Sequence, residues 1–262
     1  MDKSELPIVE RRGPALWITF NRPAMRNALN KAIFEVMQDA ITDADRDPAV
    51  RVVVITGKGD KAFSAGADLR PDAVGSPFEF DYSNPDHFAT RFFRMLETTR
   101  VPLVARVNGA AYAGGLSLVA ACDLAIAVDT AKFCAPEAAL GFAPVHVMPY
   151  LIRNVPRKIM LQMLMTAEPL SAEDARIYGL VNWVVPAAEL DAKVEWLINR
   201  LASNSPAGIG TGKQIYRAMS QMHFDQALAY ADTSFAFITN AQDVREGLAA
   251  FNEKRKPRFT GK

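Results

Sequence analysis

The sequence has few cysteines, no long apolar run and almost no net charge. Its two cysteines, Cys122 and Cys134, lie in apolar stretches without the spacing of metal ligands, which favours reduced core residues of an intracellular protein. A net charge of +1 argues against a protein that coats nucleic acid. No apolar run approaches the roughly 18 residues of a membrane span, and the first residues lack the apolar segment of a signal peptide. We therefore expect a cytoplasmic protein with no metal, no nucleic-acid partner and no membrane partner.

Half of the residues are hydrophobic and 23% are charged, which is the balance of an ordinary globular protein. A chain of 262 residues is long enough to bury a substantial core. We expect one large domain, or one domain with an appendage.

The stretch VPLVARVNGAAYAGGLSLVAACDLAIAVDTAKFCAPEAALG has the clearest local organisation. Its hydrophobic pattern predicts two buried strands with a short buried helix between them. The expected elements are a strand over 103–107, a turn of small residues over 108–115, a helix over 116–121, a strand over 124–128 and a turn that presents Glu137.

Two features of this stretch suggest chemistry. Gly114 and Gly115 stand at the start of the helix, where the first backbone N–H groups have no helical partner and favour an oxygen that becomes anionic. Glu137 has small and apolar neighbours, which should raise its pKa and make it a usable acid and base. A double glycine often serves packing alone, and a glutamate beside a proline is often a solvated turn residue. The case for a site therefore needs a second donor.

A second donor is available upstream, in RVVVITGKGDKAFSAGADLR, which predicts a strand over 52–56, a turn and a helix that opens within Phe63–Leu69. The motifs AFSAGADL, NGAAYAGG, DLAIA and FCAPE follow one another in an order that resembles the crotonase (enoyl-CoA hydratase/isomerase) superfamily. ITFNRPAMRNALN near the start, LSAEDARIYGLVNWVVP further on and FNEKRKPRF at the end extend the resemblance to nearly the whole chain.

The resemblance implies an α/β fold, a crotonase-type spiral of repeated ββα units with a C-terminal helical region. Residues 1–187 would form the spiral core with the CoA and acyl site, and residues 188–262 a helical region for oligomerisation and site covering. The family assembles as a homotrimer or a homohexamer (dimer of trimers). The resemblance also implies an acyl-CoA thioester substrate, as in fatty acid metabolism. It implies no permanently bound cofactor, since coenzyme A enters as part of the substrate.

Carried over by its motifs, the resemblance places the oxyanion-hole N–H groups on Ala67 and Gly114, each expected at the start of a helix. Such donors stabilise the enolate oxygen that forms when C2 of the thioester gains or loses a proton. Asp68 is also a candidate helix cap. The implied CoA-binding residues are Arg26, Ala65, Ala67, Asp68, Leu69, Arg70 and Gly114.

Hydratases of the family generally use two glutamates, and this chain has Ser117 at the first position and Glu137 at the second. With one carboxylate, both double-bond isomerisation and hydration stay open. Isomerases of the superfamily keep only the second glutamate, whereas hydroxycinnamoyl-CoA hydratase-lyases carry Ser and Glu and still add water. We favour hydration of a 2-enoyl-CoA, because Ser117 could hold or orient the water. A non-catalytic acyl-CoA-binding member is a further alternative.

Two segments depart from the family pattern. The stretch after Leu69 carries four aromatic residues where the family covers its acyl pocket, so either a bulky or ring-containing acyl group binds there or these side chains pack over the core. They are Phe78, Phe80, Tyr82 and Phe88. His146 stands where relatives have a glycine-rich turn, and it is either a second proton carrier or a packed residue.

Two further motifs have plain alternatives. Gly208–Lys213 lacks the spacing and the hydroxyl of a phosphate-binding loop, and no strand precedes it, so we reject that reading. The basic tail with Lys254, Arg255, Lys256 and Arg258 is either a solvated end or, by resemblance, a contact for the CoA phosphates.

The remaining elements follow from hydrophobic periodicity and capping residues. The core should end near Pro186. The pattern predicts a strand over 15–20, helices over 29–43, 157–166 and 175–178, a strand over 181–185, and C-terminal helices from 188 onward that include 214–219, 224–239 and 244–251.

Overall fold

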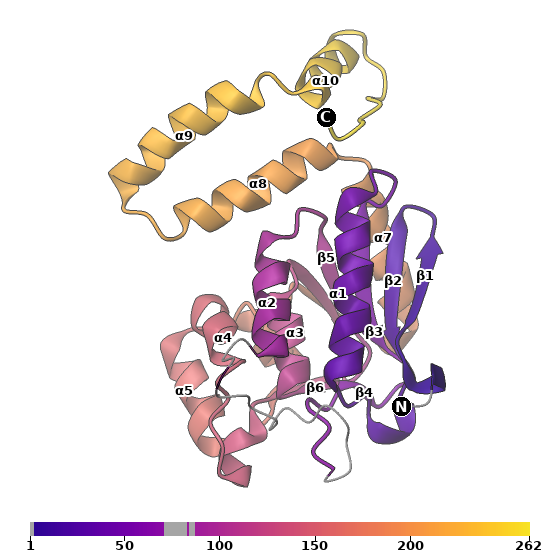
Figure 1. Ribbon diagram of the computed structural model, residues 1–262, viewed down its shortest axis with the longest axis vertical. Coiled ribbons are helices and arrows are strands. Elements are labelled where there is room, and N and C mark those ends of the chain that lie inside the picture. The colour runs from indigo at the N-terminus through magenta and orange to yellow at the C-terminus, as the bar shows by residue number, and fades with distance from the viewer. Residues whose placement is uncertain (1–2, 71–82, 84–86) are drawn as a thin grey trace.

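A computed structural model describes residues 3–70, 83 and 87–262 (Figure 1). Its larger sheet has six strands in the order β1-β2-β3-β5-β7-β10, all parallel except the β1–β2 hairpin. The strands are β1 (Ile8–Arg12), β2 (Ala15–Phe20), β3 (Val52–Gly57), β5 (Leu103–Val107), β7 (Leu124–Val128) and β10 (Trp183–Val185). All six residues of β3 are buried, which explains its unbroken β-branched run, because central strands of parallel sheets are covered on both faces.

A smaller sheet has the order β4-β6-β8-β9 and consists of β4 (Ala62–Ser64), β6 (Ala110–Tyr112), β8 (Lys132–Cys134) and β9 (Leu170–Ser171). The pairs β3/β4, β5/β6 and β7/β8 each give one strand to the large sheet and the next to the small sheet. A helix follows each pair: α2 (Phe88–Thr98), α3 (Gly114–Ala121) and α4 (Met148–Asn154). This repetition is the predicted spiral of ββα units.

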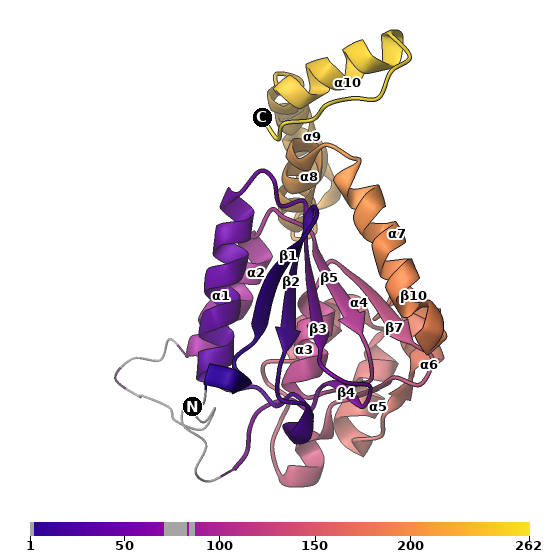
Figure 2. The same ribbon diagram turned by 90° about the vertical axis from the view of Figure 1, so that its right-hand side faces the viewer.

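Helices cover both faces of the large sheet, with α1 (Lys31–Arg46) on one side and α7 (Leu190–Ala202) on the other (Figure 2). The helix α1 begins two residues later than predicted because the Asn30 side chain accepts a hydrogen bond from Ile33 N at 3.1 Å and so caps it. The predicted Ser171 cap is confirmed, since Asp174 N donates to its Oγ at 3.0 Å. The other helices of this part are α5 (Arg157–Thr166) and α6 (Ala172–Ile177), with 3₁₀ turns η1 (Lys3–Glu5), η2 (Pro23–Met25), η3 (Pro136–Leu140) and η4 (Ala187–Glu189).

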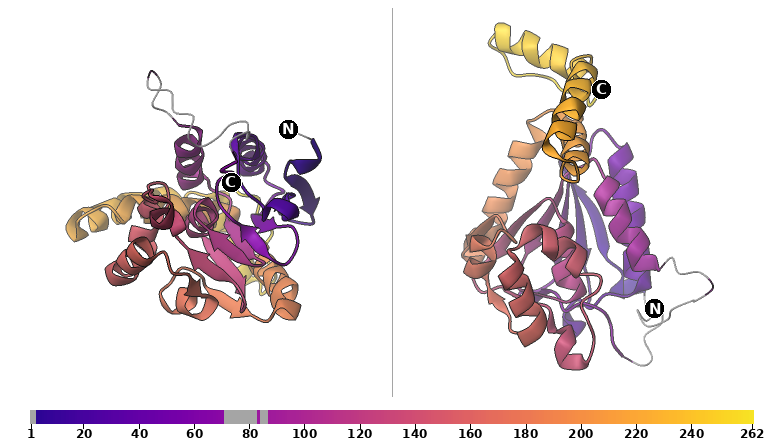
Figure 3. Two further views of the ribbon diagram at one scale, coloured as in Figure 1. Left: turned by 90° about the horizontal axis from the view of Figure 1, so that it is seen from below. Right: turned by 90° about the vertical axis from the view of Figure 1, so that its left-hand side faces the viewer.

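The core extends one helix beyond Pro186, because Leu190, Val194 and Leu197 of α7 belong to the same buried cluster as the sheet. The following helices α8 (Pro206–Met219), α9 (Phe224–Ile238) and α10 (Gln242–Asn252) stand clear of the two sheets (Figure 3). Gly208–Lys213 lies inside α8, which begins directly after Ser205 because the Ser205 side chain caps it by accepting from Gly208 N at 2.9 Å. The segment is therefore helix, and the rejection of a phosphate-binding loop is confirmed.

A buried carboxylate holds the C-terminal helices together. Asp243, only 3% exposed, accepts hydrogen bonds from Ser205 Oγ at 2.7 Å, Thr260 N at 2.8 Å and Gly261 N at 3.1 Å. Its own backbone N–H donates to the carbonyl of Lys262 at 2.9 Å. Although burial opposes the charge, the hydrogen bonds from Ser205, Thr260 and Gly261 keep the pKa of Asp243 below its usual value. One side chain thus joins the start of α8, the start of α10 and the tail.

Replacing Asp243 with alanine should destabilise this arrangement by about 2 kcal/mol or more, because it leaves several buried donors without an acceptor. Hydrogen exchange of the α10 amides should accelerate, while β3 and β5 stay protected. Because the folded pKa is depressed, the stabilisation is present above the unfolded pKa and is lost as the pH falls through the folded pKa. Asp232→Ala, at an exposed position of α9, is the control. Unchanged α10 exchange in Asp243→Ala would refute this role.

Candidate active site

Three parallel strands of the small sheet end side by side. Ser64 of β4 is in register with Ala111 of β6, and Tyr112 of β6 is in register with Cys134 of β8. Ala67, Gly114 and Glu137 follow these three strands within three residues of each strand end. Since the carboxyl ends of parallel strands meet at one edge of a sheet, the topology gathers the three candidate residues at that edge.

Ala67 lies on an extended segment held against Leu29. The Leu29 N–H donates to the Gly66 carbonyl at 2.7 Å, and Asp68 N–H donates to the Leu29 carbonyl at 2.8 Å. In a trans peptide the C=O and the following N–H point in opposite directions. The Gly66 carbonyl points to Leu29, so the Ala67 N–H points away from it, and it donates to no residue in the part of the chain that the structure describes.

The expected helix at Ala67 is wrong for the described residues. Ala62–Ser64 is strand β4, and residues 65–70 are not helical. Gly66 has a φ of +90°, outside the helical region, and the bridge to Leu29 keeps the segment extended. Asp68 caps no helix among the residues that the structure describes. Its side chain instead enters a cluster of ion pairs.

The helix α3 begins at Gly114, two residues before its predicted start at Leu116, and Gly114 stands at the start of a helix as expected. Ala113 before it has a φ of 49°, a strained conformation for a residue other than glycine. Its N–H donates to the Cys134 carbonyl at 2.9 Å, and its carbonyl accepts from Ser117 N at 3.0 Å. These two bonds fix the peptide that carries the Gly114 N–H, which has no acceptor among the described residues.

The two donor segments are in direct contact. An ideal Cβ built on Gly114 would lie 3.9 Å from Ala67 N, and one built on Gly66 would lie 3.0 Å from Gly114 N. The two backbone N–H groups therefore come from neighbouring peptides, which is the arrangement that an oxyanion hole requires.

Glu137 is half-buried in the 3₁₀ turn η3. Its Oε2 is buried and has no hydrogen-bond partner among the described residues. Burial raises its pKa, as its apolar neighbours in the sequence predicted. Burial, together with the charge of Glu137, also raises the pKa of the Cys134 thiol to about 11. A carboxyl with raised proton affinity and one unengaged oxygen is suited to moving a proton.

Ser117 is fully buried, and its hydroxyl lies 3.4 Å from the carbonyl of Ala113. The hydroxyl therefore turns toward the backbone of its own helix. That it holds a water molecule stays a prediction.

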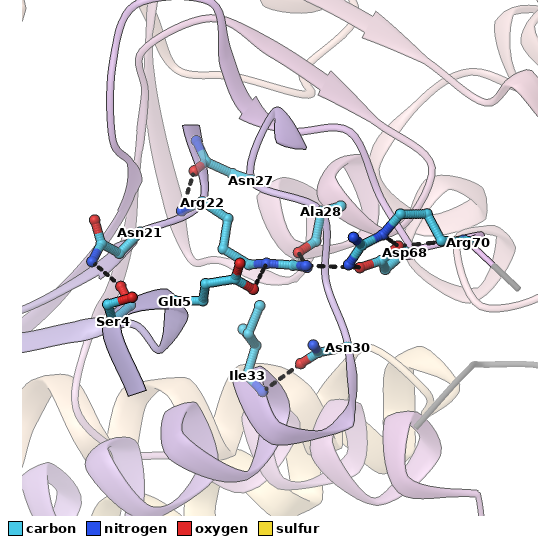
Figure 4. A network of polar contacts seen from close by, with 10 residues as sticks. All are labelled: Ser4, Glu5, Asn21, Arg22, Asn27, Ala28, Asn30, Ile33, Asp68 and Arg70. Carbon is cyan, nitrogen blue, oxygen red and sulfur yellow. Dashed lines mark hydrogen bonds and ion pairs between the residues drawn. The ribbon is translucent and has the colours of Figure 1, made fainter. Parts of the chain in front are cut away.

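A cluster of ion pairs anchors the segment after the first donor (Figure 4). The buried Arg22 guanidinium donates to Asp68 Oδ2 at 2.8 Å, to Glu5 Oε2 at 3.0 Å and to the Ala28 carbonyl at 2.8 Å. Arg70 donates to the same Asp68 carboxylate at 2.9 and 3.0 Å. Hydrogen bonds from Arg70 and then Arg22, against the opposing effect of burial, hold the pKa of Asp68 well below its usual range.

Sequence reasoning missed Arg22, although it stands in the quoted motif ITFNRP directly after a buried strand, where a charge needs buried acceptors. Arg26, which was singled out, is exposed, and its carbonyl accepts from Ala65 N at 2.9 Å. The fold thus brings Arg26 and Ala65 together beside Ala67. Leu69 and Arg70 are both exposed. Contact of these residues with CoA stays a prediction.

His146 is solvent-accessible, and its ring stacks on His87 with centroids 5.4 Å apart. Partial burial lowers the pKa of His146, which favours the neutral ring. Its role as a second proton carrier stays a prediction. Phe88 packs on Phe34 at 5.5 Å, which fits the packing alternative for that residue. Phe78, Phe80 and Tyr82 lie outside the described residues.

The basic tail is partly neutralised within the chain. Arg255 donates to both oxygens of Glu246 at 2.6 and 2.9 Å and to Glu253 at 2.6 Å. The pKa of Glu246 falls to about 2, chiefly because of the Arg255 hydrogen bond. Arg255 is therefore already paired. A CoA-phosphate contact through Lys254, Lys256 or Arg258 stays a prediction.

Known proteins match this chain over almost its whole length. The enoyl-CoA hydratase/isomerase family matches residues 11–262. A carnitinyl-CoA dehydratase from Salmonella typhi is 36% identical, with 99% of this chain and 100% of that protein covered. An enoyl-CoA hydratase from Mycobacterium smegmatis superposes with a TM-score of 0.88 at 33% identity, covering 97% of this chain and 98% of that one. An enoyl-CoA hydratase subunit from Geobacillus kaustophilus superposes with a TM-score of 0.89 at 32% identity, covering 99% of this chain and 100% of that one.

Within the described residues, no helix is long and apolar enough to cross a membrane. The matches agree with the observed spiral of ββα units and its C-terminal helices, and they extend through the segments that carry Ala67, Gly114 and Glu137. The chain is an enzyme of the enoyl-CoA hydratase/isomerase family, within the crotonase superfamily.

Proposed function

We propose that the enzyme adds water to the double bond of a 2-enoyl-CoA thioester, with Glu137 as its single acid and base. Enzymes of this family act on coenzyme A thioesters. The observation that carries the proposal is the gathering of one raised-pKa carboxyl and two unpartnered N–H groups at the same edge of the small sheet. The substrate's thioester oxygen would accept from Ala67 and Gly114.

The reaction then follows from the properties of these groups. Ionised Glu137 takes a proton from water as the water oxygen bonds to C3, and the electrons of the double bond move onto the thioester oxygen. The two N–H groups stabilise this enolate, each contributing about 3 to 4 kcal/mol. Protonated Glu137 returns its proton to C2, which gives the 3-hydroxyacyl thioester and restores the carboxylate. The name carnitinyl-CoA dehydratase, carried by relatives 36% identical, supports chemistry of this kind, since dehydration is its reverse.

A double-bond isomerase is the second candidate, and one observation favours it. The Ser117 hydroxyl donates toward the Ala113 carbonyl at 3.4 Å, so its proton is not directed at a water molecule. An isomerase would use the same Glu137 to take a proton from one carbon and return it to another.

Mass spectrometry separates the two reactions. The purified enzyme is incubated with 2-enoyl-, 3-enoyl- and cinnamoyl-CoA thioesters in water enriched in the heavy oxygen isotope. Hydration puts the label into a 3-hydroxyacyl product. A product of unchanged mass with a moved double bond identifies an isomerase, and unchanged substrates throughout would favour a non-catalytic acyl-CoA-binding protein.

We further propose the domain organisation, the oligomeric state and the cellular location of this enzyme. Residues 1–187 form the catalytic core, on which α7 packs, and the region 188–262 serves oligomerisation and covers the site in a homotrimer or a homohexamer of two trimers. Large aromatic side chains of the C-terminal helices support this assembly because they are 71 to 82% exposed: Tyr216, Phe224, Phe235, Phe237 and Phe251. Both cysteines are free, which fits a cytoplasmic enzyme.

A further inference from the structure

The first oxyanion donor is flanked by the most deeply buried ion pair among the described residues. The side chains of Arg22 and Asp68 are 1% and 2% exposed, and their atoms Nη2 and Oδ2 lie 2.8 Å apart. The guanidinium also reaches Glu5 at the surface and the carbonyl of Ala28 (Figure 4). Arg22 therefore connects the turn after β2 with the segment that follows β4.

This pair fixes the residue next to the donor. Asp68 is held through its side chain by Arg22 and through its backbone N–H by the Leu29 carbonyl at 2.8 Å. On the other side of Ala67, the Gly66 carbonyl is held by Leu29 N at 2.7 Å. The Ala67 peptide is thus anchored on both sides, its N–H points away from Leu29, and the Gly114 segment lies close to its nitrogen.

The carboxylate of Asp68 is also fully engaged. It accepts one guanidinium from the buried side and one from the exposed Arg70, whose side chain is 47% exposed. A negative group so placed has no attraction for the phosphates of CoA. This pairing gives Asp68 a structural role, and its contact with CoA stays a prediction.

We propose that Arg22 and Asp68 are positioning residues that aim the Ala67 N–H at the thioester oxygen, an inference that rests on the proposed function. The pair touches no reacting atom. It acts through the backbone between Gly66 and Asp68, and its loss lets the donor turn away. Because an oxyanion donor acts more strongly on the enolate than on the bound substrate, the defect falls on kcat more than on binding.

Two variants weaken the pair in different ways. Asp68→Asn keeps the shape of the side chain, but its amide NH₂ group is a donor and would face the donating guanidinium groups of Arg22 and Arg70. Arg22→Lys keeps the positive charge, but one ammonium group cannot reach Asp68, Glu5 and Ala28 together. Each should lower kcat about 10- to 100-fold. The dissociation constant of the thioester should change by less than about threefold. Asp47→Asn, which breaks an exposed 3.0 Å pair with Arg11, is the control and should leave both constants unchanged.

A vibrational measurement reports the donor itself. In a Glu137→Gln background, which holds substrate without turnover, the stretching frequency of an isotopically labelled thioester carbonyl is compared between free and bound enoyl-CoA. Binding to the Glu137→Gln parent should lower this frequency. In folded protein and at equal occupancy, the double variants that add Asp68→Asn or Arg22→Lys should lower it less. A variant that does not fold is recognised by its melting curve, and the carbonyl frequency of the other variant then tests the proposal.

The outcomes are distinct. A carbonyl shift that equals the parent's in either folded variant overturns the positioning role. Weaker binding with an unchanged carbonyl shift also overturns it and makes Asp68 a substrate contact. If the parent itself shows no shift, the oxyanion hole of the proposed function is wrong, and there is no donor for the pair to aim.

Discussion

Replacing Glu137 with glutamine is expected to lower turnover of the enoyl-CoA about 100-fold or more and to leave thioester binding intact. Glutamine has nearly the shape of glutamate but cannot take or return a proton. Ala67 and Gly114 stay in place, since their N–H groups are set by backbone bonds that do not involve Glu137. The measurement is steady-state turnover together with the dissociation constant by calorimetry. Glu168→Gln, at an exposed position, is the control.

The raised pKa of Glu137 predicts how the activity depends on pH and whether Glu137→Gln raises or lowers the stability of the fold. The base must be ionised, so the acidic limb of kcat/KM lies at higher pH than for an ordinary glutamate. A carboxyl whose folded pKa is raised contributes stability below its unfolded pKa, and that contribution is lost as the pH rises through its folded pKa. At neutral pH the charged form therefore costs stability, and Glu137→Gln should melt at the same or a higher temperature than wild type. A lower melting temperature would place Glu137 in a structural role.

Replacing Gly66 with alanine is expected to abolish activity and to destabilise the fold by about 3 kcal/mol or more. The added Cβ would lie 2.6 Å from the Ala113 Cβ and 3.0 Å from Gly114 N, and the φ of +90° strains any L side chain. Relief requires the two donor segments to separate, and loss of even one donor costs about 100-fold or more in kcat.

Gly13→Ala separates strain from contact. Gly13 has a φ of +57° and no atom within 4 Å of an added Cβ, so alanine there should cost only about 1 to 2 kcal/mol and no activity. Stability is measured by urea denaturation and activity on the same preparations. Gly66→Ala with wild-type kcat would show that the close approach of the two segments is not needed for catalysis.

Local patterns predicted the parts of this fold that depend on neighbouring residues. The strands β2, β5 and β7 and the helix α5 occupy the predicted ranges, because the hydrophobic pattern of consecutive residues determines which of them are buried. The helix α8 was predicted to begin eight residues late, at Gln214. Its first turns carry three glycines and depend on the Ser205 cap, which outweighs their low propensity.

The site was predictable where it follows strand ends and was missed where it depends on distant partners. Gly114 and Glu137 were found because a helix start and an apolar turn are local features. Arg22 and Asp68 are 46 positions apart, and nothing near either residue shows that they pair. Another long-range contact, the bridge between Leu29 and Ala67, keeps the expected helix at Ala67 an extended segment.

The most direct test of the account follows the proton that Glu137 carries. The enzyme is incubated with its 3-hydroxyacyl-CoA product in deuterium oxide, and deuterium at C2 is measured by mass spectrometry. The account predicts exchange at C2 by the wild-type enzyme and its loss in Glu137→Gln, with both proteins binding the thioester equally. Exchange that continues undiminished in Glu137→Gln would show that another group moves this proton, and the single-carboxylate mechanism would be wrong.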